Sequence, residues 1–139
     1  MLFFNPHKPW NEQTPRIISA LMDGNQVFDP YFWSPDGQQM FGSMGEIREE
    51  GIAVYSFTSG RFTRLSDVGF PWSVLNDGRR LLITDRQKLL VFDTGSRRSK
   101  ELFSIAPDDF DSVALSRDNR TIYFTHATRQ SDIWLMTMK

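Results

Sequence analysis

The feature that most constrains the fold of this chain is a tight-turn dipeptide that recurs at a fixed interval. Asp36-Gly37, Asp77-Gly78 and Asp118-Asn119 begin at positions 36, 77 and 118, so that each follows the one before by 41 residues. Asp-Gly and Asp-Asn accept the left-handed backbone that a short hairpin turn requires. Because apolar residues flank each dipeptide, the spacing predicts three equivalent repeats, each built around an antiparallel hairpin.

Each repeat continues with further short strands. A third, apolar segment is expected in all three repeats, and a fourth, more polar segment is expected in the first two. The third segments are residues 52–55, 89–92 and 133–136, and the fourth segments are residues 61–65 and 99–103. Four short strands in about 40 residues, the outer ones polar, are typical of a β-propeller blade. The sequence therefore predicts an all-β protein of about three four-stranded antiparallel blades, at 28–68, 69–109 and 110–139, the last without a fourth strand.

The two ends of the chain bear on how such blades close into a ring. Residues 1–27 are interpreted as a half-blade, because Leu2–Phe4 resembles a third strand and Arg16–Ser19 a fourth. Three blades leave the ring incomplete, since propellers have about four to eight. The chain is then a piece of a longer parent, or copies associate so that the Arg16–Ser19 strand of one copy completes the last blade of another. We expect association, with a homodimer giving six blades.

The first turn carries a resemblance to a known family. The run Trp33–Gly37, with Ser34, Pro35, Asp36 and Gly37, resembles the Trp-Ser-Pro-Asp-Gly signature of PD40 repeats, the WD40-like blades of TolB-like β-propellers. The second and third repeats depart from it with Leu75–Gly78 and Leu115–Asn119. The resemblance extends from about Phe28 to Lys139 and implies a sensor or interaction module of the kind that follows a kinase or DNA-binding domain in some large bacterial proteins.

The signature residues are interpreted as structural. Ser34 is expected to bond turn backbone, Pro35 to fix one dihedral angle, and Asp36-Gly37 to close the hairpin, as Asp77-Gly78 and Asp118-Asn119 do later in the chain. Trp33 is expected to fill space between neighbouring blades, and the same is expected of Trp72 and Trp134.

Composition excludes several classes of function. The chain has 139 residues, a net charge of −1 and no cysteine, so disulfides and cysteine-ligated metal centres are excluded. A balanced charge gives no general reason to bind nucleic acid or an anionic membrane. The sequence lacks an apolar run of the roughly 20 residues that a membrane span needs, and it lacks the pattern of a signal peptide. The compartment stays open, with the cytoplasm slightly favoured.

Catalytic motifs are also missing from the sequence. It contains no G-x-S-x-G elbow, phosphate-binding loop or dinucleotide fingerprint, and His7 and His126 lack metal-ligand spacing. We therefore predict a non-enzymatic scaffold without a cofactor that binds a protein or a small ligand. The alternative is an enzyme whose acidic side chains converge only at the centre of an assembled ring.

Two groups of charged residues are candidates for binding. Three carboxylates between the second and third repeats could hold a hard cation such as Ca²⁺, and these are Asp108, Asp109 and Asp111. The ligand face is predicted from a charged loop and from carboxylates that begin or precede innermost strands. Its members are Asp29, Glu46, Arg48, Glu49, Glu50, Asp67 and Asp111.

Overall fold

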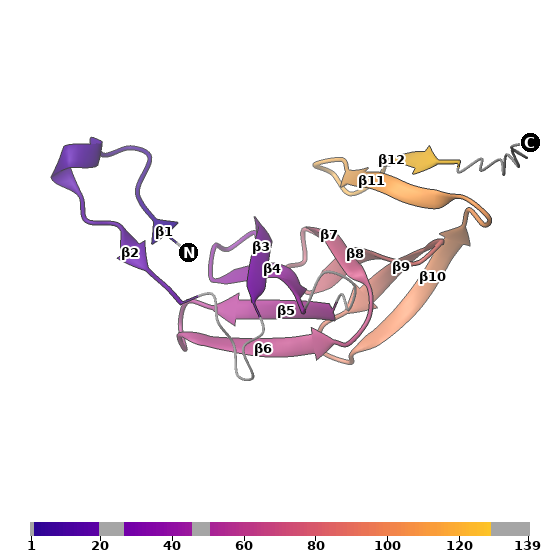
Figure 1. The fold of residues 1–139 in the computed structure, drawn as a ribbon, viewed down its shortest axis with the longest axis horizontal. Helices are drawn as coiled ribbons and strands as arrows, with labels where there is room; N and C mark the ends of the chain where they lie inside the picture. Colours follow the sequence, from indigo (N-terminus) through magenta and orange to yellow (C-terminus); the bar gives the residue numbers. More distant parts are fainter. Residues whose placement is uncertain (1, 20–26, 46–50, 129–139) are drawn as a thin grey trace, which may run out of the picture. The chain divides into compact units, whose positions relative to one another are not determined.

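The computed structural model describes residues 2–19, 27–45 and 51–128, and it confirms the all-β class, with 57% strand and 3% helix. The described strands form four antiparallel sheets (Figure 1). The chain divides into two compact units, Met1–Val68 and Gly69–Lys139. In the described residues, no helix is both long and apolar enough to cross a membrane.

The first unit contains a two-stranded and a four-stranded sheet. In the small sheet, β1 (Leu2–Phe3) pairs with β2 (Arg16–Ile17), and the link between them holds the 3-10 helix η1 (Trp10–Glu12). The larger sheet has the order β3-β4-β5-β6. Its strands are β3 (Phe28–Trp33), β4 (Gln39–Met44), β5 (Gly51–Ser56) and β6 (Arg61–Ser66).

The second unit repeats the four-stranded arrangement. Its larger sheet, in which consecutive strands are again neighbours, consists of β7 (Phe70–Val74), β8 (Arg80–Asp85), β9 (Lys88–Asp93) and β10 (Arg98–Ser104). A second sheet pairs β11 (Asp109–Leu115) with β12 (Ile122–Ala127). The predicted third and fourth segments of the first two repeats all lie within these strands, whereas residues 133–136 lie outside the described residues.

The three repeated turns have the left-handed residue that the dipeptides predict. The backbone φ angle is 70° at Gly37, 68° at Gly78 and 58° at Asn119. In the first turn the Ser34 Oγ donates to the Asp36 carboxylate and accepts the N–H of Gln39 at 2.9 Å. Ser116 makes the same two contacts in the third turn, with Asp118 and Thr121.

Hydrogen bonds hold the turn carboxylates in their charged form. The Ser34 hydroxyl and the Gln38 N–H lower the pKa of Asp36, and the Ser116 hydroxyl and the Arg120 N–H lower that of Asp118. The second turn has Leu75 in place of the serine. There, desolvation opposes the charged form of Asp77, but the backbone N–H groups of Arg80 and Arg79 outweigh it and lower the pKa.

Each unit has an apolar core in which residues of both its sheets take part. In the first unit Phe3 of β1 and the buried Ile18, just after β2, pack with Phe28 of β3. In the second unit Leu82 and Leu89 of the larger sheet pack with Val113 of β11. Phe103, Phe110 and Phe124 extend this second core, with ring centroids 5.3 to 5.9 Å apart. Successive sheets within a unit are therefore joined through buried side chains.

Candidate functional site

A β-bulge interrupts the first strand of the hairpin in every repeat. The pairing register shifts between Pro30 and Phe32, between Pro71 and Ser73, and between Phe110 and Ser112. The extra residues at these bulges are Tyr31, Trp72 and Asp111. Tyr31 and Trp72 are 41 residues apart and so are equivalent, whereas the third bulge is displaced by two residues. A bulge re-aims its side chain, and bulges are common beside binding sites.

A hydroxyl residue on the next strand contacts each bulge residue. These hydroxyl residues, spaced by 41 positions, are Ser43, Thr84 and Thr125. Tyr31 Oη lies 3.1 Å from Ser43 Oγ, and Trp72 Nε1 donates to Thr84 Oγ1 at 2.9 Å. In the third repeat Thr125 Oγ1 donates to Asp111 Oδ2 at 3.3 Å. The repeats therefore conserve a position for a polar contact while changing the chemistry of the group placed there.

The predicted ligand-face carboxylates are exposed but already have polar neighbours. Asp29 in β3 accepts a hydrogen bond from the Tyr31 hydroxyl at 3.0 Å. Asp67, after β6, forms an ion pair with Arg64 at 2.5 Å. Asp29 and Asp67 belong to the first unit and Asp111 to the second. The rest of the predicted face, Glu46, Arg48, Glu49 and Glu50, lies outside the described residues.

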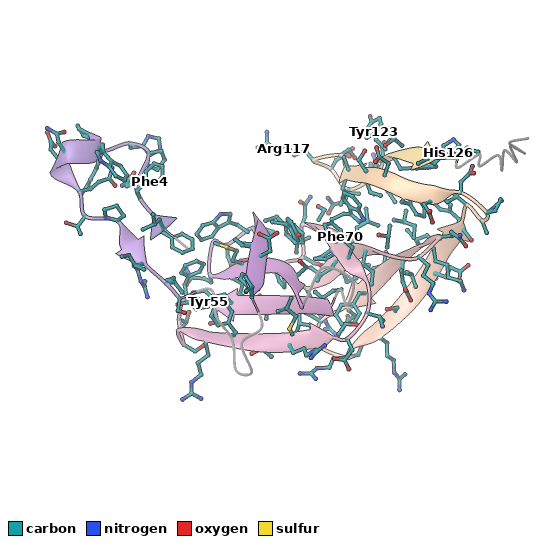
Figure 2. The ribbon with its side chains drawn as sticks, in the orientation of Figure 1. Phe4, Tyr55, Phe70, Arg117, Tyr123 and His126 are labelled. Atoms are coloured by element: carbon teal, nitrogen blue, oxygen red, sulfur yellow. The ribbon has the colours of Figure 1, made fainter. Side chains whose placement is uncertain are left out.

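The three candidate cation ligands lie at the open end of the β11–β12 hairpin. Asp108 Oδ2 is 2.9 Å from Nδ1 of His126, an exposed residue near the end of β12 that Figure 2 labels. Asp111 instead contacts Thr125, and Asp109 begins β11. Within the described part of the chain, no three acidic or histidine side chains are grouped as a metal site would need. The Asp108–His126 contact is not evident from the sequence, because it depends on the strand register.

An aromatic groove in the first unit was not predicted. Its cavity volume is about 450 Å³. The groove is lined by Leu2, Phe3, Phe4, Pro30, Tyr31, Phe32, Trp33 and Met40. Phe4 is 58% exposed, Tyr31 44% and Trp33 49%, so the walls present ring surface to solvent (Figure 2 labels Phe4). Trp33, predicted to fill space between blades, does contact Phe3 of the neighbouring sheet, but half of its surface remains open.

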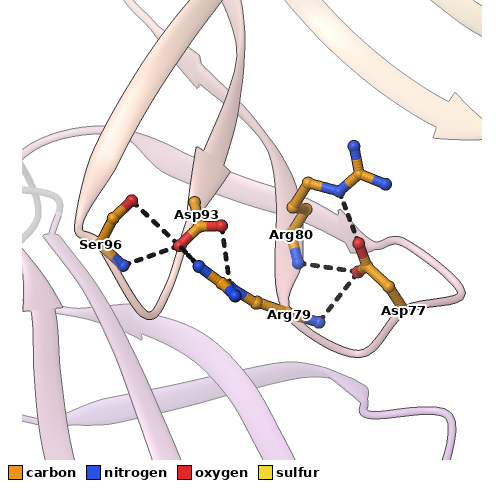
Figure 3. A network of polar contacts seen from close by, with 5 residues as sticks. All are labelled: Asp77, Arg79, Arg80, Asp93 and Ser96. Carbon is orange, nitrogen blue, oxygen red and sulfur yellow. Dashed lines mark hydrogen bonds and ion pairs between the residues drawn. The ribbon is translucent and has the colours of Figure 1, made fainter.

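A charged network stabilises the β9–β10 turn of the second unit (Figure 3). Asp93 accepts the backbone N–H of Ser96 at 2.7 Å and the guanidinium Nη2 of Arg79 at 2.9 Å. These bonds favour the carboxylate, so they lower the pKa of Asp93 to about 2. Beside this network Arg80 pairs with Asp77 at the β7–β8 turn.

This network predicts a pH-dependent effect of Asp93→Asn. The depressed pKa means that the ionised carboxylate stabilises the folded state above the ordinary value of 3.8, and that this contribution disappears as pH falls through about 2. Urea unfolding should show Asp93→Asn less stable than the original chain from about pH 5 upward, with the gap closing toward pH 2. A gap that stays constant down to pH 2 would contradict this assignment.

Comparison with known proteins does not assign the chain to a family. No protein-family model matches it, and no curated protein matches it.

Proposed function

We propose that this chain is a non-enzymatic scaffold of PD40-type β-propeller blades that presents loops to a partner and self-associates to close its ring. The observation that carries the proposal is the 41-residue period, because it recurs as antiparallel sheets with equivalent turns and with a bulge in the first strand of each hairpin. The two complete sheets each run from first to fourth strand in chain order, as a propeller blade does.

The join between successive sheets in the second unit supports a propeller-like arrangement. The first strands of these sheets, β7 and β11, lie side by side. The turn after β7 also bonds the turn after β11, because the backbone N–H of Asn76 donates to Asn119 Oδ1 at 2.6 Å and the Asn76 amide donates to the Arg117 carbonyl at 3.0 Å. In a propeller, inner strands of neighbouring blades are adjacent in this way.

Self-association would bring the β1–β2 sheet of one copy to the last blade of another, where the strand that begins at Arg16 would serve as the missing fourth strand. A two-stranded sheet exposes strand edges that can pair with another chain. The β1–β2 pair corresponds to third and fourth strands, and β11–β12 to first and second strands, of the predicted blade. A homodimer of six blades follows from the repeat count. The alternative is a propeller segment within a longer regulatory protein, such as a kinase-linked sensor.

The proposed mechanism is recognition by loops on a rigid framework. Loops tolerate sequence change better than packed strands, so binding specificity would reside in the connections and at the bulge positions. The partner would be a protein or a small ligand, and no step of chemistry is assigned to any residue.

Light scattering on the purified chain tests the self-association part of the proposal. We expect a molar mass near twice 16.2 kDa. Deleting residues 1–20 should return the mass to that of one chain, because the β1–β2 sheet is then missing. Far-ultraviolet circular dichroism checks that the shortened chain keeps its sheets. A monomer at all concentrations would contradict closure by assembly and favour the longer parent chain.

A further inference from the structure

We propose that the aromatic groove of the first unit binds a small organic cation of the quaternary or methylated ammonium class. The described residues that line the groove all belong to that unit, and they lie on β1 and β3 and next to them, with Met40 on β4. Five of the eight lining residues that the structure describes are aromatic: Phe3, Phe4, Tyr31, Phe32 and Trp33. Aromatic rings attract cations through the negative potential of their faces, and tryptophan does so most strongly.

The rings of Phe57 and Phe3 do not cover the outer face of Trp33. Trp33 stacks on Phe57, with ring centroids 4.8 Å apart and the planes within 9° of parallel. Phe3 is nearly perpendicular to both rings, 5.7 Å from Trp33 and 5.4 Å from Phe57. Similar distances to both members of the stack place Phe3 beside it, not over the outer face of Trp33. This agrees with the 49% exposure of Trp33.

The charges around the groove favour a cation over a neutral or anionic ligand. Tyr31 lines the groove, and its hydroxyl donates to Asp29 Oδ2 at 3.0 Å, which places a carboxylate one hydrogen bond from the aromatic wall. None of the described residues that line the groove is basic. Arg16, opposite Phe3 in the β1–β2 pair, is exposed and is not a lining residue.

The size of the groove fits a small molecule. Its volume of about 450 Å³ lies within the range of roughly 300 to 1,000 Å³ typical of small-molecule pockets. A quaternary ammonium group has no hydrogen-bond donor on nitrogen, so it can be desolvated against rings without leaving a donor unsatisfied. The carboxylate of Asp29 then supplies long-range attraction, and the outer face of Trp33 supplies contact.

A pair of isosteric probes separates charge from shape. Choline and its neutral carbon analogue, 3,3-dimethyl-1-butanol, are titrated into the full chain while the indole signals are followed by NMR, with calorimetry for affinity. We expect choline to bind roughly threefold to thirtyfold more tightly than the neutral analogue, the range of a cation–π contact. Equal affinities would overturn the proposal and leave an unselective apolar groove.

Two variants and a control assign the site. Trp33→Leu keeps an apolar side chain but removes the aromatic face, and Asp29→Asn removes the negative charge of an exposed side chain. Each variant should weaken choline binding at least threefold. Tyr123→Leu, which changes an exposed aromatic residue of the second unit, should leave binding unchanged. If Trp33→Leu fails to fold, Asp29→Asn and the indole shifts still decide. Unchanged choline affinity in Asp29→Asn would overturn the proposal. A choline affinity that falls as protein concentration rises would also overturn it, because a second copy would then fill the groove.

Discussion

Replacing Gly42 by alanine is expected to destabilise the first unit by roughly 3 kcal/mol or more, the upper range for overpacking a buried site. Gly42 is buried in β4 and pairs with Pro30 of β3. A Cβ at this position would lie 2.9 Å from Pro30 Cα and would overlap the carbonyl oxygen of Asp29. Because these atoms belong to the backbone, relief requires β3 itself to move.

The neighbouring variant Ser43→Ala is the matched control for Gly42→Ala. It removes the contact of Ser43 with Tyr31 without adding an atom, so we expect a loss of only about 0.5 to 1.5 kcal/mol. Urea unfolding followed by tryptophan fluorescence measures both variants. If Gly42→Ala costs less than about 1 kcal/mol, then β3 adjusts freely and the close approach of the two strands is not a constraint.

Leu82→Ala is expected to lower the free energy of unfolding of the second unit by about 2 to 5 kcal/mol. Leu82 is 1% exposed and packs with Leu89 and Val113, so truncation leaves a cavity in the core that joins the two sheets of this unit. Thermal unfolding monitored by circular dichroism, together with urea titration, gives the size of the loss.

The repeat supplies a control at an equivalent position. Tyr123, which Figure 2 labels, lies 41 residues after Leu82, on β12. It is 62% exposed. Tyr123→Ala should therefore cost less than about 1 kcal/mol in dilute protein, as surface substitutions do. A loss as large as that of Leu82→Ala would mean that the Tyr123 side chain is buried in the folded protein, and it would contradict the exposed position of this residue.

The hairpins could be predicted from the sequence because a tight turn is a local requirement. Each turn needs one residue with a left-handed backbone, which Gly and Asn accept. Gly37, Gly78 and Asn119 adopt this conformation. The short apolar strands that follow each turn could likewise be predicted from the local sequence. The family resemblance, the closed ring and the partner remain predictions.

The groove and the polar contacts could not be predicted, because they depend on register and tertiary approach. A bulge at Tyr31 shifts the pairing by one residue, and period-two reasoning does not reveal such a shift. The contacts of Tyr31 with Asp29 and Ser43 follow from it. The groove also combines Leu2–Phe4 with residues near 30, and no sequence periodicity relates those two segments.

The turn-to-turn bond made by Asn76 has a consequence for how repeats of this kind can be rearranged. The residues equivalent to Asn76 in the other two repeats are Pro35 and Arg117. Proline has neither a backbone N–H nor a side-chain amide, so Pro35 can make neither bond that Asn76 makes. A shuffled gene that places the first repeat ahead of the third would therefore keep every strand and turn but lose this connection. At this joint Asn76, with Asn119 and Arg117 as its partners, therefore favours the second repeat over the first as the neighbour of the third.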